Sequence, residues 1–341
     1  MMNKGKIIIF GATGKVGCYT SLYLKEMGYD IVAVGRRSSD NGFFADYDVP
    51  YVSVDIMDKE QFEKLPKENV FGVIDMAGIL PAVMKGFDPR KYIMINEIGT
   101  LNVLDYSISS GVKRFVYPQT YSDLLYLCNG EKPVDADATR SFPKNNDHSI
   151  YAITKNAACD LVMHYSFKYG FKYFILRLQN IFCYHPNPSY FIDGKKKMTG
   201  QRAIIEQAER GEDIELWGNP ECKRDVVYVK DCVQIIEKAL SSEAPSGFYN
   251  VGNGMPVSRL DQIKGIIEVF GDPSKSKIII NRSKPDSPNF QLDITKTVEN
   301  LGFKPKYDYI SFLEDLKEEM INNRFEKLWG KESDYTDGIE K

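Results

Sequence analysis

The chain has 341 residues, enough for two lobes, and its 43% hydrophobic and 27% charged residues are typical of a soluble globular protein. A formal net charge of -3 argues against a general nucleic-acid-binding protein, and the basic run at residues 195–197 is short enough to be a solvated loop. No apolar run approaches the length of a membrane span, so we expect a cytoplasmic protein with no membrane partner.

The cysteines and the three histidines lack the paired spacing of a metal site. We therefore expect no bound metal and reduced thiols, as in a cytosolic protein. The cysteines are Cys18, Cys128, Cys159, Cys183, Cys222 and Cys232.

The first motif follows an apolar run at residues 6–10, which we expect to be a buried strand. Three glycines follow this run, and a helical pattern begins among them. The first glycine permits a tight turn, the second lets the backbone approach a phosphate, and the third lets the helix pack on the strand. The helix start adds unpaired N–H groups that attract an anion. The sequence thus predicts a nicotinamide dinucleotide site formed by Gly11, Thr13, Gly14, Lys15, Val16 and Gly17.

The first half of the chain alternates short β-branched runs with helical patterns, which predicts an α/β fold with a doubly wound parallel sheet. We expect strands at residues 30–34, 51–54, 70–76, 114–117 and 171–178, and helices at residues 16–27, 93–110 and 151–169. Beyond residue 180, glycines and prolines divide the chain into shorter pieces. Strands are expected there at 226–229 and 248–251, and a helix at 311–323.

These patterns divide the chain into a dinucleotide-binding domain and a smaller, mostly C-terminal α/β substrate lobe. The first comprises residues 1–180, with residues 226–251 returning to it. The substrate lobe comprises residues 181–225 and 252–325. The charged tail at residues 326–341 is expected to be disordered.

Tyr151 and Lys155 are four residues apart, which places them on one face of the helix expected at 151–169. A phenol titrates near pH 10, so ionising it at neutral pH costs about 4 kcal/mol. A lysine cation about 4 Å away in a partly buried site supplies a free energy of that order. Tyr151 could then act as a general base toward a sugar hydroxyl, and as a general acid in the reverse step. The alternative is an ordinary amphipathic helix that carries both residues.

Thr120 follows the strand expected at 114–117, at the edge where open α/β sheets bind their ligands. Its hydroxyl could hydrogen-bond the reacting oxygen and share in the proton transfer. Its simpler role is to begin a turn.

Together these motifs resemble the extended short-chain dehydrogenase/reductase superfamily, in its nucleotide-sugar epimerase/dehydratase branch. The resemblance covers about residues 6–320, and it implies a Rossmann-type sheet, a catalytic set of Thr120, Tyr151 and Lys155, and a homodimer formed through the helix that bears Tyr151. It implies further cofactor contacts at the end of the fourth strand and beside the nicotinamide ribose, from Met76, Ala77, Gly78 and Asn96.

The same resemblance implies a nucleotide-diphosphate sugar as the substrate. Asn180 and Arg224 match positions that contact the diphosphate, and an arginine there can bind it in a bidentate manner. Trp217 could stack on the nucleotide base or fill the core of the lobe. Arg282 or Asp286 could lie near the nucleotide, or form a surface salt bridge. The full expected substrate set is Thr120, Tyr121, Asn180, Trp217, Arg224 and Arg282.

The choice between NAD and NADP stays open. At the end of the second strand, Arg36 and Arg37 would attract a 2′-phosphate, which favours NADP, and Asp40 comes too late to bind a ribose hydroxyl directly. The family resemblance favours a retained NAD. Asp55 and Ile56 are expected to flank the adenine, although Asp55 could simply cap a strand end.

Relatives that dehydrate their substrates carry an Asp-Glu pair after the catalytic hydroxyl. Here Tyr121 and Ser122 take those places and Asp123 comes too late, so a 4,6-dehydratase is not expected. The leading hypothesis is an NAD(P)-dependent epimerase acting at C4 through a transient keto intermediate. The alternatives are an NADPH-dependent reductase of a 4-keto nucleotide sugar and, less favoured, a non-catalytic dinucleotide-binding sensor.

Overall fold

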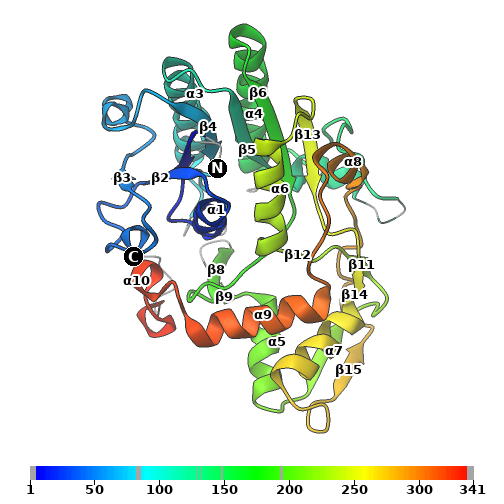
Figure 1. Cartoon of the computed structure of the whole chain (residues 1–341). Helices are drawn as coiled ribbons and strands as arrows, with labels where there is room; N and C mark the ends of the chain where they lie inside the picture. The colour runs from blue at the N-terminus through cyan, green and yellow to red at the C-terminus, as the bar shows by residue number, and fades with distance from the viewer. Residues whose placement is uncertain are drawn as a thin grey trace.

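The computed structural model describes residues 5–81, 86–128, 130, 132–146, 149–192 and 195–335. Its centre is a seven-stranded parallel sheet in the order β13-β6-β5-β4-β1-β2-β3 (Figure 1). The predicted doubly wound Rossmann-type α/β fold is therefore confirmed. The strands are β1 (Lys6–Phe10), β2 (Asp30–Gly35), β3 (Tyr51–Ser53), β4 (Val70–Asp75), β5 (Arg114–Thr120), β6 (Lys172–Leu178) and β13 (Gly247–Val251).

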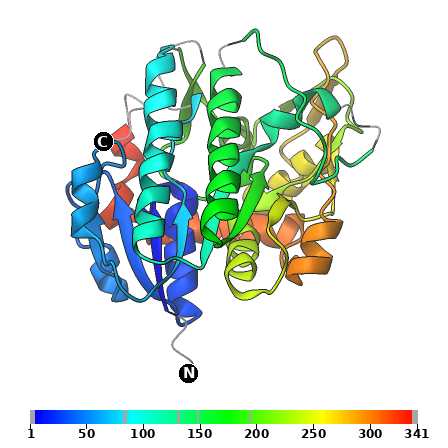
Figure 2. The same cartoon turned by 90° about the horizontal axis from the view of Figure 1, so that it is seen from above.

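Each face of this sheet has its own hydrophobic core, because successive side chains of a strand point to opposite faces. In β1, Ile7 and Ile9 join the core under α1 (Lys15–Glu26) and α6 (Val229–Ser241). Ile8 and Phe10 join the core under α3 (Thr100–Ser109) and α4 (Ser149–Tyr169), which run side by side in Figure 2.

The helix expected at residues 93–110 is divided into two pieces, a π-helical segment (Ile93–Gly99) and α3. A short helix α2 (Pro89–Tyr92) precedes them, outside the expected range. The strand expected at residues 226–229 also differs from the prediction. It forms β12 (Val227–Tyr228), which pairs with β7 (Ile181–Phe182) outside the central sheet. Within the predicted return of residues 226–251, it is β13 that joins the sheet, beside β6.

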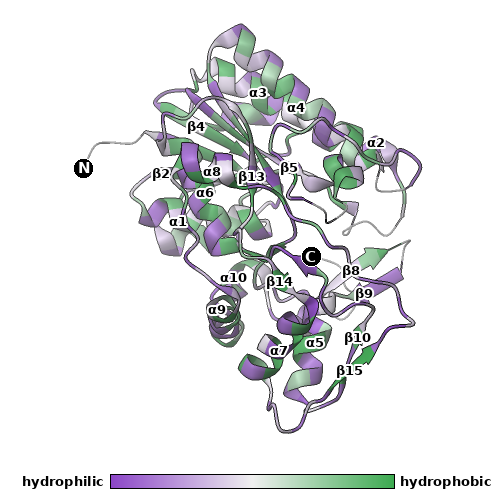
Figure 3. Ribbon diagram, turned by 90° about the vertical axis from the view of Figure 1, so that its right-hand side faces the viewer, coloured by the Kyte–Doolittle hydropathy of each residue, from purple (hydrophilic) through white to green (hydrophobic). Residues whose placement is uncertain are grey.

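A smaller lobe lies below the sheet domain (Figure 3). It holds an antiparallel hairpin, a parallel strand pair and two helices that pack against each other. A short antiparallel pair, β11 (Lys223–Arg224) with β14 (Val257–Ser258), lies at its upper end. The hairpin, the strand pair and the two helices are, in that order, β8 (Ser189–Ile192) with β9 (Lys195–Met198), β10 (Ile214–Trp217) with β15 (Ile278–Asn281), and α5 (Gly200–Glu209) with α7 (Arg259–Phe270).

The expectation of a disordered tail is wrong for residues 326–335. After α8 (Thr295–Leu301) and α9 (Tyr309–Asn322), the chain forms α10 (Glu326–Trp329) and a 3-10 turn (Glu332–Tyr335). Besides its charged residues, this segment has an apolar side that is buried in the fold: Phe325, Leu328, Trp329 and Tyr335. Residues 336–341 lie outside the described part of the chain.

A buried ion pair joins the end of β5 to β6. Arg177 donates from Nε and Nη2 to the two carboxylate oxygens of Asp123, at 3.0 and 3.1 Å, and both side chains are almost completely buried. Arg177 Nη1 also donates to the Ala136 carbonyl oxygen at 2.8 Å. The Asp123 carboxylate thus uses its hydrogen bonds to fix the segment that follows Thr120, and it does not face a substrate.

We predict that Asp123→Asn lowers the free energy of unfolding by about 3–5 kcal/mol, because it leaves a buried guanidinium without its counter-charge. The exposed bidentate pair of Arg140 and Asp160 provides a matched control. Asp160→Asn should cost less than about 1 kcal/mol, because water screens that pair. Denaturant unfolding of the two variants measures both values, and equal losses would contradict this account of the buried pair.

Candidate active site

The candidate site lies where the strand order reverses, between the neighbouring strands β1 and β4. Open α/β sheets bind their ligands at the carboxyl edge of the strands, at this point of the topology. The two loops that leave these strands touch. Gly11 has a φ of +75°, and a Cβ placed on it would lie 2.7 Å from the backbone nitrogen of Ala77. A side chain at residue 11 would therefore force the two loops apart.

The glycine turn itself fits a dinucleotide pyrophosphate. A Cβ on Gly17 would lie 2.2 Å from the Gly11 carbonyl oxygen, so only glycine lets α1 approach the turn this closely. Gly14 caps α1 with extended backbone and no side-chain hydrogen bond, and both Gly14 and Lys15 are exposed. The N–H groups of the first helical turn thus have no capping side chain, as an anion site requires.

The loop after β4 shows a role for Asn96 that differs from the expected one. Its side chain is 1% exposed, and its Oδ1 accepts from the Ile79 backbone N–H at 2.9 Å. Its Nδ2 donates to Thr154 Oγ1 of α4 at 3.2 Å. Asn96 therefore ties the loop of Met76, Ala77 and Gly78 to the helix that bears Tyr151, and its amide is used within the fold rather than facing an open site.

At the end of β2, the two arginines have different environments. Arg36 is exposed, whereas Arg37 donates from Nη1 to the Leu328 carbonyl oxygen at 2.6 Å. Asp40 is buried, and its carboxylate accepts from the backbone N–H groups of Gly42 and Phe44, so it stabilises its own turn. One of the two guanidiniums expected to attract a 2′-phosphate is thus already hydrogen-bonded to the C-terminal segment.

At the end of β3, Asp55 caps its own turn, since its Oδ1 accepts from the Met57 backbone N–H at 3.0 Å. Ile56 is buried and packs against Gly99, where a Cβ would lie 2.5 Å from its Cδ1 atom. These contacts support the simpler of the two roles considered for Asp55.

Tyr151 and Thr120 meet at the carboxyl end of β5, one strand beyond β4. Burial raises the pKa of the Tyr151 phenol well above its usual value, and a hydrogen bond with the Thr120 side chain lowers it in part. Thr120 also caps the turn that follows, because its Oγ1 accepts from the Ser122 backbone N–H at 3.1 Å. The hydroxyl expected to assist the phenol therefore does reach it.

Lys155 lies four residues after Tyr151, in a buried position on the same helix. Its Nζ is 3.7 Å from the centre of the Tyr117 ring, within range of a cation–π interaction. Burial lowers the Lys155 pKa to about 8, and the charge on Asp75 raises it in part. Burial likewise raises the Asp75 pKa to about 6, against the opposing effect of Lys155.

Asp75 was not among the expected site residues. It ends β4, next to β5, and its Oδ2 is buried without a hydrogen-bond partner among the described residues. A charged residue at the carboxyl end of a buried strand was the available signal.

The expected electrostatic effect of Lys155 on Tyr151 is not seen here. The Lys155 cation faces Tyr117 and is coupled to Asp75, and burial dominates the pKa of the phenol.

The substrate side of the site brings together several expected residues. The Tyr121 ring stacks on Phe290 at 4.9 Å, and the nearby Arg224 charge lowers the Tyr121 pKa against the effect of burial. The Arg224 Nε is buried without a hydrogen-bond partner in the described structure. Asn180 is exposed just beyond Leu178, which pairs with Thr120 across the sheet.

A second arginine, which the sequence analysis did not single out, lies close to Arg224. Burial and the Arg224 charge both lower the pKa of Arg259, so the two guanidiniums are close enough for their positive charges to repel each other. Two such cations with a buried, unpaired N–H form a candidate anion site. No sequence signal marked Arg259, because β11 and β14 bring it there from a distant part of the chain.

The remaining expected substrate residues lie on the outside of the lower lobe. Trp217 is 52% exposed and its Nε1 donates to Glu215, so it does not fill the core. Arg282 is exposed. Asp286 accepts from the Asn219 backbone N–H at 2.7 Å, so its carboxylate stabilises the turn after β10.

Among the described residues, no group of three or more histidine, cysteine or acidic side chains could hold a metal ion, and all six cysteines are unpaired. None of the helices in this part of the chain is both long enough and apolar enough to cross a bilayer.

Comparison with known proteins agrees with this geometry. The chain is 26% identical over 331 residues to a putative UDP-glucose 4-epimerase of Methanocaldococcus jannaschii, with 93% of this chain and 99% of the relative covered. It is 25% identical over 260 residues to the GDP-L-fucose synthase of Sinorhizobium fredii, with 74% and 80% covered. The solved UDP-glucose 4-epimerase of Thermotoga maritima has the same fold, with a TM-score of 0.73, 23% identity, and 93% and 99% covered.

A match over most of the chain shows the family to which the protein belongs. The sequence pattern of the NAD dependent epimerase/dehydratase family matches residues 7–252, which is most of the chain and includes both the glycine turn and Tyr151. The protein therefore belongs to the NAD dependent epimerase/dehydratase family.

Proposed function

We propose that this protein epimerises a nucleotide-diphosphate sugar at C4 through a transient keto intermediate. The observation that carries the proposal is the half-buried Tyr151 side chain, whose phenol is hydrogen-bonded to Thr120 at the carboxyl end of β5, beside the point where the strand order reverses. A phenol in this position can take a proton from a sugar hydroxyl and later return it.

Three side chains share the proton transfer. Tyr151 accepts the hydroxyl proton, and Thr120 holds the reacting oxygen in line with the phenol. When bound at the glycine turn, the dinucleotide would supply the hydride acceptor and donor. Lys155 supplies a positive charge on the same helix, held against the Tyr117 ring, although its charge does not lower the Tyr151 pKa in this structure.

Asp75 supports the charge of Lys155. A buried ammonium loses its proton more easily than an exposed one, and the Lys155 pKa of about 8 lies close to neutral pH. The neighbouring carboxylate opposes this loss. We propose that Asp75 is a positioning residue that keeps Lys155 protonated at neutral pH.

Arg224 and Arg259 support a diphosphate as the recognised part of the substrate. The buried, unpaired Nε of Arg224 needs an acceptor, and a phosphate oxygen supplies one. The exposed Asn180 lies on the same edge of the sheet and can bind the same group. Solved relatives are described as complexes with UDP-glucose and with UDP-glucuronic acid, which supports this substrate class.

An NADPH-dependent reductase of a 4-keto nucleotide sugar is the second candidate. The exposed Arg36 favours it, since a guanidinium at the end of β2 attracts a 2′-phosphate. The engagement of Arg37 with Leu328 weakens this argument, and several solved relatives are described as complexes with NAD. We propose NAD as the cofactor, with NADP as the alternative that Arg36 supports. The intact Tyr151 and Lys155 speak against a non-catalytic sensor.

We also propose a cytoplasmic homodimer. Exposed apolar side chains gather on α4 and on the π-helical segment that packs against it, and such a patch on neighbouring helices is typical of a protein interface. They are Ile93, Met94, Ile98, Ile153, Met163 and Phe167.

Replacing Tyr151 with Phe removes the proton acceptor and leaves the ring. We expect kcat to fall by about a hundredfold to ten-thousandfold, with dinucleotide affinity changed little. Tyr169→Phe is the matched control on the same helix, because Tyr169 is exposed at its far end. Conversion of a panel of UDP- and GDP-sugars, followed by chromatography, measures the loss. Full turnover by the Tyr151 variant would exclude this mechanism.

Epimerisation leaves the cofactor unchanged overall, and reduction consumes it. With a 4-keto nucleotide sugar and excess NADPH, we expect no stoichiometric loss of absorbance at 340 nm. A loss equal to the substrate added would establish the reductase in place of the epimerase.

Asp75→Asn tests the support of Lys155. Removing the carboxylate should lower the Lys155 pKa below about 8, so activity should be lost at a pH about one unit lower on the alkaline side. Asp160→Asn, an exposed carboxylate on α4, should leave the profile of kcat/KM against pH unchanged. An unchanged alkaline limb in the Asp75 variant would show that Lys155 does not depend on it.

A further inference from the structure

The C-terminal segment at residues 325–335 lies against the glycine turn. Trp329 Nε1 donates to the Thr13 carbonyl oxygen at 2.9 Å, across more than three hundred residues of sequence. The Trp329 ring packs on Phe325 at 4.4 Å, and Phe325 packs on Tyr19 of α1 at 4.7 Å. We call this segment the C-terminal clasp. Its apolar side chains join the core that covers α1.

The clasp is also fastened to the loop after β2. Arg37 donates to the Leu328 carbonyl oxygen, and Asn41 Nδ2 donates to the Lys327 carbonyl oxygen at 3.1 Å. Lys327 Nζ forms an ion pair with Asp46 at 2.7 Å. The clasp therefore bridges the glycine turn and the end of β2, which are the two parts of this fold that hold the phosphates and the adenosine ribose of a dinucleotide.

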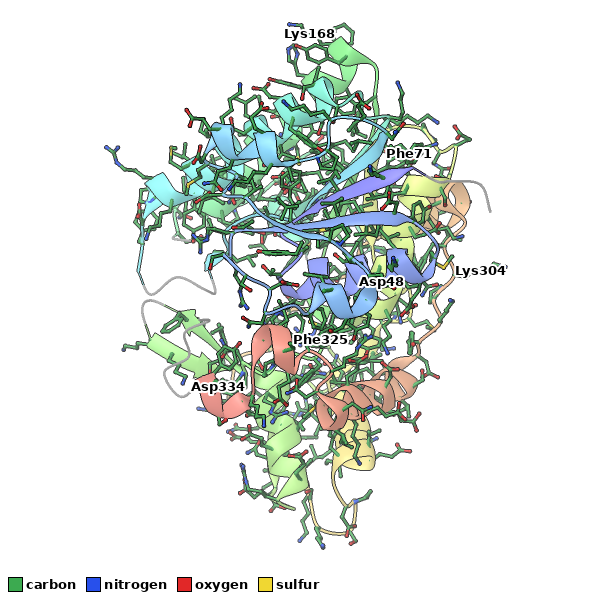
Figure 4. All side chains as sticks on the ribbon, turned by 60° about the vertical axis from the view of Figure 1, so that its left-hand side comes forward. Asp48, Phe71, Lys168, Lys304, Phe325 and Asp334 are labelled. Carbon is green, nitrogen blue, oxygen red and sulfur yellow. The ribbon has the colours of Figure 1, made fainter. Side chains whose placement is uncertain are left out.

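The other side of the clasp contacts the lower lobe. The His185 ring lies 4.6 Å from the Trp329 ring, and burial together with the charges of Lys15 and Arg37 lowers the His185 pKa. Arg202 of α5 pairs with Glu332 at 2.7 Å. Figure 4 shows the clasp, marked by Phe325 and Asp334, between the sheet domain and the lower lobe.

We propose that the clasp forms the closing wall of the cofactor site and slows dissociation of the dinucleotide, so that one cofactor serves many turnovers. The inference rests on the proposed function, and it deepens it. An epimerase restores its cofactor within each turnover and gains from keeping it bound. A reductase must release the oxidised dinucleotide every time, and a fastened wall over the site would slow that release.

The clasp slows release of the dinucleotide through its contacts with the sheet domain. Departure of the adenosine half past β2 requires the clasp to separate from Thr13, Arg37 and Asp46. The ion pair of Lys327 and Asp46 is exposed, so its charges can be exchanged without disturbing the core. Trp329 is buried, so its replacement tests the apolar contact instead.

The test is the dissociation rate of NADH from the full-length protein. Enzyme loaded with NADH is mixed with a large excess of NAD, and the decay of NADH fluorescence gives the rate. We expect Trp329→Ala and Lys327→Asp each to raise the rate, the first by at least about tenfold, because each removes a contact that must break on release. Lys331→Asp is the control, since Lys331 is exposed on the same segment and pairs only with the neighbouring Glu326 among described residues.

Combining Lys327→Asp with Asp46→Lys restores the ion pair in reverse and should restore slow dissociation. This rescue separates a specific contact from general loss of stability, and it keeps the test valid if Trp329→Ala does not fold. Unchanged rates in the Lys327 variant, or a rate slowed by Trp329→Ala, would overturn the proposal. The proposed epimerase function is judged separately by sugar turnover, which Tyr151→Phe should strongly reduce whether or not the clasp retains the cofactor.

Discussion

The proposed chemistry depends on holding two ionisable side chains, Tyr151 and Lys155, in a site that favours their uncharged forms. Burial raises the pKa of the phenol and lowers that of the amine, so both shifts oppose the charges that proton transfer requires. The fold places compensating groups around them. Thr120 hydrogen-bonds to the phenol, the Asp75 charge raises the pKa of the ammonium, and the ammonium lies 3.7 Å from the centre of the Tyr117 ring.

The topology explains why these groups meet. Asp75 ends β4, and Thr120 ends the neighbouring β5, so the parallel sheet brings both to one edge. Helix α4 packs beside that edge and places the Lys155 ammonium over the Tyr117 ring. Because β1 lies on the other side of β4, the glycine turn lies beside the same edge. The candidate dinucleotide site and the proposed proton-transfer site are thus built by three adjacent strands.

The sequence predicted this part of the molecule well. The apolar run at residues 6–10, the three glycines and the spacing of Tyr151 and Lys155 are local signals, and each corresponds to an element that forms where it was expected. Local patterns could not predict the partners of single side chains. Asn96 is bonded within the fold by Thr154, and Arg37 by Leu328, because tertiary contacts place those groups opposite them.

The C-terminal segment is the clearest case of this limit. Its charged composition predicted disorder, but Phe325 and Trp329 are spaced to place both rings on one side of a short helix, where Tyr19 buries them. No local signal connects Trp329 to Thr13. The contact follows from α9, which carries the chain from the lower lobe back to the sheet domain (Figure 1).

The most direct measurement of the central claim follows the hydrogen at the reacting carbon. A nucleotide sugar labelled with deuterium at C4 is converted by the enzyme in ordinary water, and the product is analysed by mass spectrometry and NMR. Transfer to the cofactor and back predicts that the C4 epimer keeps its deuterium, with no added cofactor consumed. Loss of the deuterium to water, or its appearance in free dinucleotide, would contradict the account.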